Sequence, residues 1–269
     1  IRDEEGTTPR KKKNALARFH AKLCSLKFFD PACGSGNFLT ETYICLRKLE
    51  DAVLNELRQG QTEFAFVDDE VGGRRVSLNQ FYGIEINDFA VKVAESALWI
   101  SRLKANGENF MFYEIGHNDF PLNESANIVE GNALRIDWND VLPAANCSFV
   151  MGNPPFVGFK SASQAQKDDM HAIFGLQAKL LDYVCAWYMK AGRYMQNTSC
   201  HAAFVSTNSV CQGKMAADLW SQLQRGLGVQ IDFAHRTFVW DSEASEKASV
   251  HCVIVGFSKE GVSEKKIYF

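Results

Sequence analysis

The sequence predicts an α/β fold built on a mostly parallel sheet of seven strands, with one antiparallel strand and helices on both faces. Short apolar runs alternate with longer amphipathic stretches, as in a parallel sheet whose strands are joined by helices. The last two apolar runs follow one another without a helix between them, so we expect a hairpin that contributes the antiparallel strand. A chain of 269 residues fits one large domain, or one domain with an appendage.

The expected strands are apolar runs bounded by polar or turn-forming residues. They comprise residues 26–30, 81–86, 126–130, 147–151, 202–206, 230–233 and 250–257. The expected helices have apolar residues at helical spacing and comprise residues 37–58, 87–104, 180–195 and 215–226. Residues 59–77 contain glycine and mixed charges, and we expect an inserted loop or a small hairpin there.

Composition indicates an ordinary soluble protein, with 46% hydrophobic and 23% charged residues. The net charge of -3 does not mark a nucleic-acid binder, so contacts to DNA would need a local basic face or a separate module. The eight cysteines are scattered without a Cys-x-x-Cys pair, which predicts a reducing, cytoplasmic setting and no zinc site. No apolar run approaches the ~20 residues that span a bilayer, so we expect no membrane partner.

The two ends of the chain carry separate expectations. Residues 1–13 are polar and end in four basic residues, which favours a solvated tail or loop over a DNA-binding arm. We expect residues 1–25 to lead into a core domain of residues 26–269. Residues 265–269 form a strand-like segment without a terminating signal, so we expect this chain to be a fragment of a longer one.

The tetrapeptide Asn153-Pro154-Pro155-Phe156 directly follows an apolar run that we expect to be a buried strand. Two prolines cannot continue a sheet, because neither has a backbone N–H and each fixes φ. Asn153 should therefore lie at the carboxyl end of its strand, the edge at which ligands bind in open α/β sheets. An amide, two stiff prolines and an aromatic ring suit a flat ring that carries an amine. This combination predicts methyl transfer to an amino nitrogen.

A glycine-rich turn follows the first expected strand. Gly34 and Gly36 allow a tight turn and close approach of a ligand to the backbone. The turn lacks the Gly-Lys-Ser/Thr of a triphosphate-binding loop, which disfavours a triphosphate. A lone Gly-x-Gly is often only a turn, but the acidic residue before it and the adjacent proline favour a nucleoside-type ligand. The candidate binding residues in this segment are Asp30, Ala32, Cys33, Gly34, Gly36, Asn37 and Phe38.

Two further candidates follow the second and third expected strands. Glu85, with Ile86 beside it, can accept hydrogen bonds from both hydroxyls of a ribose, although a helix start would also favour an acidic residue there. Asn132, with Ala133 beside it, can pair with the edge of an adenine ring, although Gly-Asn is also a common turn. Because parallel strands end at one edge, these side chains should line a single site.

These segments resemble the S-adenosylmethionine-dependent amino-methyltransferases of DNA, with residues 30–38, 81–87, 131–134 and 153–156 at the positions of motifs I, II, III and the catalytic motif. The order of the motifs resembles the gamma-class adenine methyltransferases. Residues 28–39, 128–138, 203–213 and 238–257 are similar to the MmeI-like type IIL restriction–modification enzymes. One departure is Asn132, where many related methyltransferases carry Asp.

The resemblance implies a Rossmann-like class I methyltransferase fold, S-adenosylmethionine as cofactor and the N6 amine of adenine as acceptor. It implies that Asn153 and the carbonyl of Pro154 grip the amine of an adenine flipped out of double-stranded DNA. Phe156 would stack on that base, and Phe238 would form a second wall, although core packing is an equal reading of Phe238. No metal is expected in this site. The family's nuclease, helical and target-recognition regions would lie outside this chain.

Two alternatives stay open at this point. Asn-Pro-Pro-aromatic loops also occur in enzymes that methylate ribosomal RNA or a protein glutamine, but Phe156 and the long region after it favour DNA. A non-catalytic scaffold subunit would keep the same fold. The intact Asp30, Gly34, Gly36, Asn153 and Phe156 argue against that reading.

Overall fold

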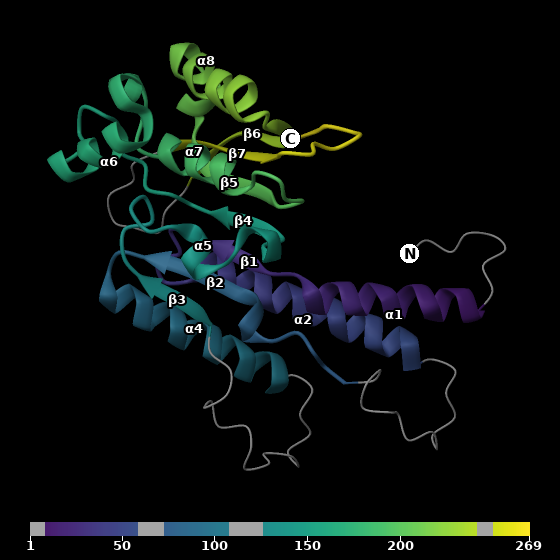
Figure 1. The fold of residues 1–269 in the computed structure, drawn as a ribbon. Helices are drawn as coiled ribbons and strands as arrows, with labels where there is room; N and C mark the ends of the chain where they lie inside the picture. Colours follow the sequence, from purple (N-terminus) through teal and green to yellow (C-terminus); the bar gives the residue numbers. More distant parts are fainter. Residues whose placement is uncertain (1–8, 59–72, 108–125, 241–249) are drawn as a thin grey trace.

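The fold is seen in a computed structural model that describes residues 9–58, 73–107, 126–240 and 250–269. Its strands are β1 (Phe28–Asp30), β2 (Phe81–Glu85), β3 (Asn127–Glu130), β4 (Phe149–Gly152), β5 (His201–Thr207), β6 (Gln230–Trp240), β7 (Val250–Ser258) and β8 (Lys266–Tyr268). They form one sheet in the order β3-β2-β1-β4-β5-β7-β6-β8 (Figure 1). The predicted α/β fold is confirmed.

The directions of the strands confirm the predicted hairpin. β7 pairs antiparallel with both β5 and β6, whereas the other neighbouring strands pair parallel. The strand count was wrong by one, because the described residues form an eight-stranded sheet. The additional strand, β8, has three exposed residues and pairs with β6 from Phe233↔Lys266 onward. It falls within residues 265–269, which are strand-like in the sequence, but its three exposed residues have no buried face that would assign it to the sheet.

Helices cover both faces of the sheet, as predicted. The helices are α1 (Pro9–Ser25), α2 (Asn37–Arg58), α4 (Asp88–Gly107), α5 (Trp138–Val141), α6 (Gln164–Phe174), α7 (Cys185–Tyr194) and α8 (Gly213–Ser221). Short 3-10 turns are η1 (Leu78–Gln80), η2 (Ala144–Asn146), η3 (Gly175–Leu180) and η4 (Asn208–Cys211), and η5 (Gln222–Gly226) is a π-helical extension of α8. Figure 1 shows α1, α2 and α4 on one side of the sheet and α5, α7 and α8 on the other.

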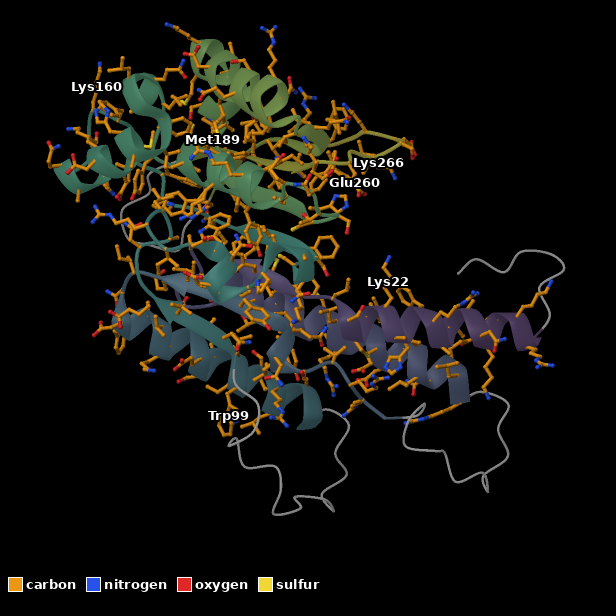
Figure 2. All side chains as sticks on the ribbon, viewed as in Figure 1. Lys22, Trp99, Lys160, Met189, Glu260 and Lys266 are labelled. Atoms are coloured by element: carbon orange, nitrogen blue, oxygen red, sulfur yellow. The ribbon has the colours of Figure 1, made fainter. Side chains whose placement is uncertain are left out.

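Two buried clusters form the core, one on each face of the sheet. Phe28 packs with Leu39 and Tyr43 of α2, whereas its neighbour Phe29 belongs to the cluster that contains Met189 of α7 (Figure 2). Consecutive residues of a strand point to opposite faces, and β1 is buried throughout because helices cover both of its sides. The parallel pairing of β1 with β2 and β4, and of β2 with β3, places the carboxyl ends of these four strands at one edge.

Several elements differ from the sequence prediction. Residues 10–13 belong to α1, whose apolar side packs on α2, so the expected tail or loop was wrong there; residues 1–8 lie outside the described part. The helix expected from residue 180 begins at Cys185, after η3. Of the expected insertion 59–77, residues 59–72 lie outside the described part and 73–77 form no helix or strand. Among the described helices, none combines the length and apolarity needed to cross a bilayer.

Helix α6 is absent from the sequence prediction although its start carries a signal. Ser163 is the N-cap: its hydroxyl accepts from the Gln166 N–H at 3.3 Å, and the Gln166 side chain accepts from the Ser163 N–H at 2.9 Å. This reciprocal pair is a capping box, which marks helix starts in sequences. The helix matters because it borders the cavity described next.

Candidate functional site

A cavity of about 660 Å³ lies at the carboxyl edge of the sheet. Its walls come from the turns after β1, β2, β3 and β4 and from α6 and α7; the lining residues are Pro31, Ala32, Ile84, Glu85, Ile86, Gly131, Asn132, Ala133, Asn153, Pro155, Ser163, Ala165, Gln166, Asp169, Tyr183 and Trp187. Its volume fits a nucleoside-sized ligand. The predicted convergence of Ala32, Glu85, Asn132 and Asn153 on one site is therefore seen.

The turn after β1 requires glycine at two positions. Gly34 has φ +54° and Gly36 has φ +82°, values that side-chain-bearing residues rarely adopt. A Cβ atom on Gly36 would also lie 3.0 Å from Cβ of Ala94 in α4, so glycine lets the start of α2 approach that helix. The backbone N–H of Gly34 donates to Oε2 of Glu85 at 2.9 Å. This hydrogen bond joins the turn after β1 directly to the end of β2.

Asp30 is a buried carboxyl group with an unused acceptor. Oδ1 accepts from the Ala32 N–H at 3.0 Å, while the buried Oδ2 has no hydrogen-bond partner among the described residues. Burial raises the pKa of Asp30 to about 7, and the charge of Glu85 adds to this shift while the bond from Ala32 opposes it. A Cβ atom on Gly152 would lie 2.4 Å from Oδ1, so the glycine leaves room for this carboxyl group.

Glu85 and Asn132 each make hydrogen bonds within the protein. Oε1 of Glu85 accepts from the Asn87 N–H at 2.9 Å, and Oε2 accepts from Gly34. Oδ1 of Asn132 accepts from the Leu134 N–H at 2.9 Å. Each oxygen has more than one lone pair, so both side chains retain acceptor capacity toward the cavity.

Asp169 joins the cavity wall from α6 and was missed in the sequence. Its carboxylate accepts hydrogen bonds from Arg135 Nε at 2.7 Å, Asn132 Nδ2 at 2.9 Å and the Tyr183 hydroxyl at 3.0 Å. Burial, followed by this bond to Asp169, raises the pKa of the Tyr183 phenol. Trp187 of α7 donates from Nε1 to the Pro31 carbonyl at 3.1 Å. These hydrogen bonds therefore join α6 to the turn after β3 and α7 to the turn after β1.

Asn153 lies directly after β4, as predicted from the two prolines. Its Oδ1 is buried and has no hydrogen-bond partner among the described residues. Pro154 is buried, whereas Pro155 is exposed and lines the cavity. An orphaned amide oxygen at a cavity wall is a ready acceptor for an N–H of a ligand, because an unpaired buried polar atom is costly.

The remaining predicted residues do not line this cavity. Those that are not among the lining residues are Asp30, Cys33, Gly34, Gly36, Asn37, Phe38 and Pro154. Phe156 is half-buried, one residue beyond Pro155. Phe238 lies in β6, paired with Cys252, and its ring meets the ring of His235 edge-on at 5.5 Å. The two aromatic residues expected to hold a base are thus outside the cavity that the described residues enclose.

Residues 6–269 match the family described as "MmeI, DNA-methyltransferase domain". The chain belongs to this family. As an MmeI-type domain it is 40% identical over 262 residues to DNA methyltransferase A of Bacillus subtilis (strain 168), across 94% of this chain and 29% of the relative.

Two solved structures resemble this chain, and one of them is an MmeI enzyme. The type IIL restriction-modification enzyme MmeI in complex with DNA matches 95% of this chain with a TM-score of 0.84 and 45% identity, over 34% of its own chain. The DrdV–DNA complex shares only the fold, with 15% identity and a TM-score of 0.54 over 97% of this chain and 27% of its own. The MmeI-type domain described here thus spans about a third of the length of these relatives.

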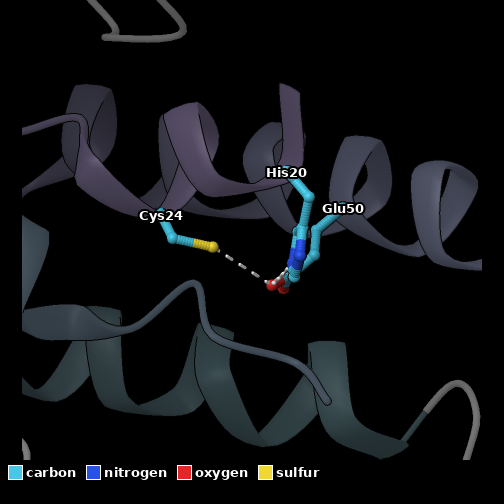
Figure 3. A group of neighbouring side chains, drawn as sticks. All are labelled: His20, Cys24 and Glu50. Atoms are coloured by element: carbon cyan, nitrogen blue, oxygen red, sulfur yellow. Dashed lines mark hydrogen bonds and ion pairs between the residues drawn. The ribbon is translucent and has the colours of Figure 1, made fainter. Parts of the chain in front are cut away.

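A second group of polar side chains lies away from the cavity, between α1 and α2. His20, Cys24 and Glu50 place potential metal-ligand atoms within 4.8 Å of one another (Figure 3). Spacing along the chain does not reveal this group, because its members come from different helices. Glu50 already accepts from His20 Nε2 at 2.9 Å and from Arg47 at 2.8 Å. The adjacent guanidinium disfavours a cation, so we interpret the group as a link between helices.

The same carboxylate also fixes the segment before β2. The backbone N–H groups of Arg75 and Val76 donate to Oε1 of Glu50 at 2.6 and 3.0 Å. Burial alone would raise the pKa of Glu50, but these bonds, the bond from His20 and the charge of Arg47 together hold the pKa below its ordinary value. Glu50 is thus a buried, charged side chain that is held by hydrogen bonds from α1, α2 and the segment before β2.

Proposed function

We propose that this chain transfers a methyl group from S-adenosylmethionine to the exocyclic N6 amine of adenine in DNA, as the modification core of a restriction–modification enzyme. The observation that carries the proposal is the orphaned, buried Oδ1 of Asn153 beside a cavity that Glu85 and Asn132 also line. Supporting it, the relatives include a DNA methyltransferase and a restriction-modification enzyme in complex with DNA.

The residues of the cavity fit the cofactor. Glu85 offers acceptors for ribose hydroxyls, and Asn132 offers an amide for the edge of an adenine ring. Asp30 does not line the cavity, but its unpartnered Oδ2 suits the ammonium group of the amino-acid end, which would also ionise the carboxyl. The turn from Ala32 to Phe38, with Ile86 and Ala133, would complete the cradle. When bound, S-adenosylmethionine supplies a methyl group on a positively charged sulfur that leaves readily.

Asn153 and Pro154 would hold the acceptor amine. The lone pair of an adenine amine is delocalised into the ring, so the amine is a poor nucleophile. Oδ1 of Asn153 would accept one amine N–H and the carbonyl of Pro154 the other, which concentrates the lone pair on nitrogen and orients it. Pro155 and its neighbour fix the backbone, because proline restricts φ. No side chain with a shifted pKa has to remove the proton before transfer.

The target base would reach this site by leaving the duplex. Flipping a base out of the stack costs a few kcal/mol, and stacking on an aromatic ring returns about 1–3 kcal/mol. Phe156 is our candidate for that platform, and Phe238 for a second wall. Phe156 lies outside the cavity lining but directly follows Pro155, which lines it, so we expect the base to enter on the side of Asn153 and Pro155.

Double-stranded DNA is therefore the proposed partner. The net charge of -3 gives this chain little general attraction for phosphates, so further regions of a longer enzyme would supply the contacts that read sequence. In that enzyme, residues 26–269 would form the catalytic domain and residues 1–25 would lead into it. No metal is required by this chemistry.

The test is to identify the methylated product. The chain would be incubated with methyl-labelled S-adenosylmethionine and unmethylated genomic DNA, followed by digestion and mass spectrometry of the nucleosides. We expect N6-methyladenine. Label in N4-methylcytosine would reject the assigned base, and label only in parallel samples of ribosomal RNA or protein would support the corresponding alternative. A chain that binds the cofactor but labels none of these acceptors, even at DNA concentrations high enough to offset weak binding, would support a scaffold role.

A further inference from the structure

Asp169 fixes the orientation of the Asn132 amide. Its carboxylate can only accept hydrogen bonds, so the group of Asn132 that faces it at 2.9 Å must be the N–H-bearing Nδ2. The backbone N–H of Leu134 can only donate, so the group that faces it at 2.9 Å must be Oδ1. The two partners, one on each side, leave the amide a single orientation.

The carboxylate that sets this orientation is itself held firmly. Asp169 is 5% exposed and also accepts from Arg135 and from the buried Tyr183 hydroxyl. Three donors from two separate segments, the turn after β3 and the segment before α7, therefore hold one side chain, and its position depends on α6 remaining packed beside the cavity. Such a network costs more to disturb than a single surface contact.

The fixed amide has a defined pattern of free positions. Asn132 retains one acceptor lone pair on Oδ1 and one N–H on Nδ2. An asparagine amide in this state pairs with adenine, which offers an amine N–H beside a ring nitrogen acceptor. A 6-oxopurine offers the reverse order, an oxygen acceptor beside a ring N–H. It would fit only if the amide turned over, and Asp169 opposes that turn.

We propose that Asp169 is a positioning residue that makes the cavity selective for an adenine over a 6-oxopurine base in the cofactor. The inference rests on the proposed function, in which Asn132 meets the adenine ring of S-adenosylmethionine. Replacing the carboxylate by an amide should weaken the choice, because Asn at position 169 can offer Asn132 either an oxygen or an N–H group and leaves only the Leu134 N–H to oppose the turn.

The test compares two ligands by calorimetric titration of the full 269-residue chain: S-adenosylhomocysteine and its deaminated counterpart S-inosylhomocysteine. For the unchanged protein we expect at least ~100-fold tighter binding of the adenosyl ligand, since a mismatched pair leaves polar groups unpaired. Asp169→Asn should lower this ratio at least ~10-fold. A purely structural role of Asp169 would weaken both ligands alike and leave the ratio unchanged.

The matched control is Asp168→Asn, which makes the same change at the neighbouring, exposed position of α6. It should leave both affinities and their ratio unchanged. An Asp169→Asn ratio equal to that of the unchanged protein would overturn this inference and leave the proposed cofactor intact. If the unchanged protein bound neither ligand, the proposed cofactor would fall, and this inference with it.

A charge swap keeps the inference testable if Asp169→Asn does not fold. Asn132→Asp alone places two carboxylates face to face and should weaken S-adenosylhomocysteine at least ~10-fold. Adding Asp169→Asn restores a donor–acceptor pair in the reverse sense, and the double variant should regain most of the affinity. A double variant no tighter than Asn132→Asp alone would contradict the pairing.

Discussion

Gly34 donates its backbone N–H to Oε2 of Glu85 at 2.9 Å, so the carboxylate that faces the cavity also builds the turn beside it. The other oxygen of Glu85 accepts from the Asn87 N–H at the start of α4. One side chain thereby joins the turns after β1 and β2. Binding a ribose would add to these bonds, because each carboxylate oxygen can accept more than one.

Replacing Glu85 should therefore weaken the cofactor and loosen the turn together. For Glu85→Ala we expect about 10–100-fold weaker binding of S-adenosylhomocysteine, as hydrogen bonds to a charged group contribute roughly 1.5–3 kcal/mol. Glu85→Gln keeps one acceptor oxygen, so its affinity for S-adenosylhomocysteine should lie between those of the unchanged chain and Glu85→Ala. Calorimetric titration gives these affinities. Glu95→Ala, on the outer side of α4, is the control; equal binding by Glu85→Ala and Glu95→Ala would exclude this role.

Asp30 should make the stability of the fold depend on pH. Burial raises its pKa to about 7 in the folded chain, well above the ~3.9 of an unfolded Asp. The folded state therefore holds the proton more tightly, and the free energy of unfolding should rise as pH falls from 7 toward 4. Above pH 7 the ionised, buried carboxylate lowers stability by ~1–4 kcal/mol.

Asp30→Asn should remove that dependence. At pH 8 the variant should be more stable than the unchanged chain, and the difference should shrink as pH falls through the 7-to-4 window. Urea unfolding at several pH values measures both curves. Curves that stay parallel across this range would show that Asp30 does not change protonation on unfolding.

Gly152 should not tolerate a side chain, because a Cβ atom there would lie 2.4 Å from Oδ1 of Asp30. For Gly152→Ala we expect a loss of ~1–3 kcal/mol in the free energy of unfolding, the usual range for an added methyl group in a packed site. Gly226→Ala is the control, since a Cβ there meets no atom within 4 Å. Urea unfolding of both variants gives the comparison, and similar stabilities would argue against a close fit at Gly152.

The part of the site that the sequence predicts follows from strand ends. Apolar runs identify the strands, and the prolines after Asn153 stop β4, so Glu85, Asn132 and Asn153 had to meet at one edge. Nothing in local spacing reveals Asp169, which meets Asn132 across 37 residues, or Trp187, which meets Pro31 across 156. Such partners depend on how α6 and α7 close over the edge. The capping box of Ser163 could have revealed the helix itself.

The aromatic residues show another limit of the sequence. The strand expected at residues 230–233 stopped short of Phe238, whereas β6 runs on to Trp240, so the sequence predicted neither the length of β6 nor which way this ring points. The structure contains register shifts in β6 on both sides of His235, which alternation along a strand does not anticipate. The place of Phe238 in a sequence motif therefore does not fix where its ring lies relative to the cavity.

Glu50 should be essential for stability rather than for transfer. It is fully buried and accepts from His20, Arg47 and two backbone N–H groups, so Glu50→Ala leaves these donors unpaired and should cost ~3–5 kcal/mol. Glu56→Ala, which removes a half-exposed pair with Lys12, should cost less than ~1 kcal/mol. Thermal unfolding distinguishes them. Equal midpoint temperatures of unfolding for Glu50→Ala and Glu56→Ala would mean that the buried Glu50 contributes little to stability.

Asn153 should separate transfer from cofactor binding. Its buried Oδ1 has no partner among the described residues, so Asn153→Ala removes no hydrogen bond known to hold the fold. We expect methyl transfer to DNA to fall at least ~100-fold, the loss typical when one preorganised polar contact to a reacting group is removed. The affinity for S-adenosylhomocysteine should change less than ~3-fold. Single-turnover transfer assays and calorimetric titration give the two values.

Asn146→Ala makes the same change in η2, before the amino end of β4, and should affect neither value. Asn153→Asp keeps acceptor oxygens and should retain more transfer than Asn153→Ala, because the proposed role of Asn153 is to accept an amine N–H. If Asn153→Ala kept full transfer, the amine would have to be held by other groups. If it lost cofactor binding and transfer in equal measure, the Asn153 side chain would belong to the cofactor pocket and not to the acceptor site.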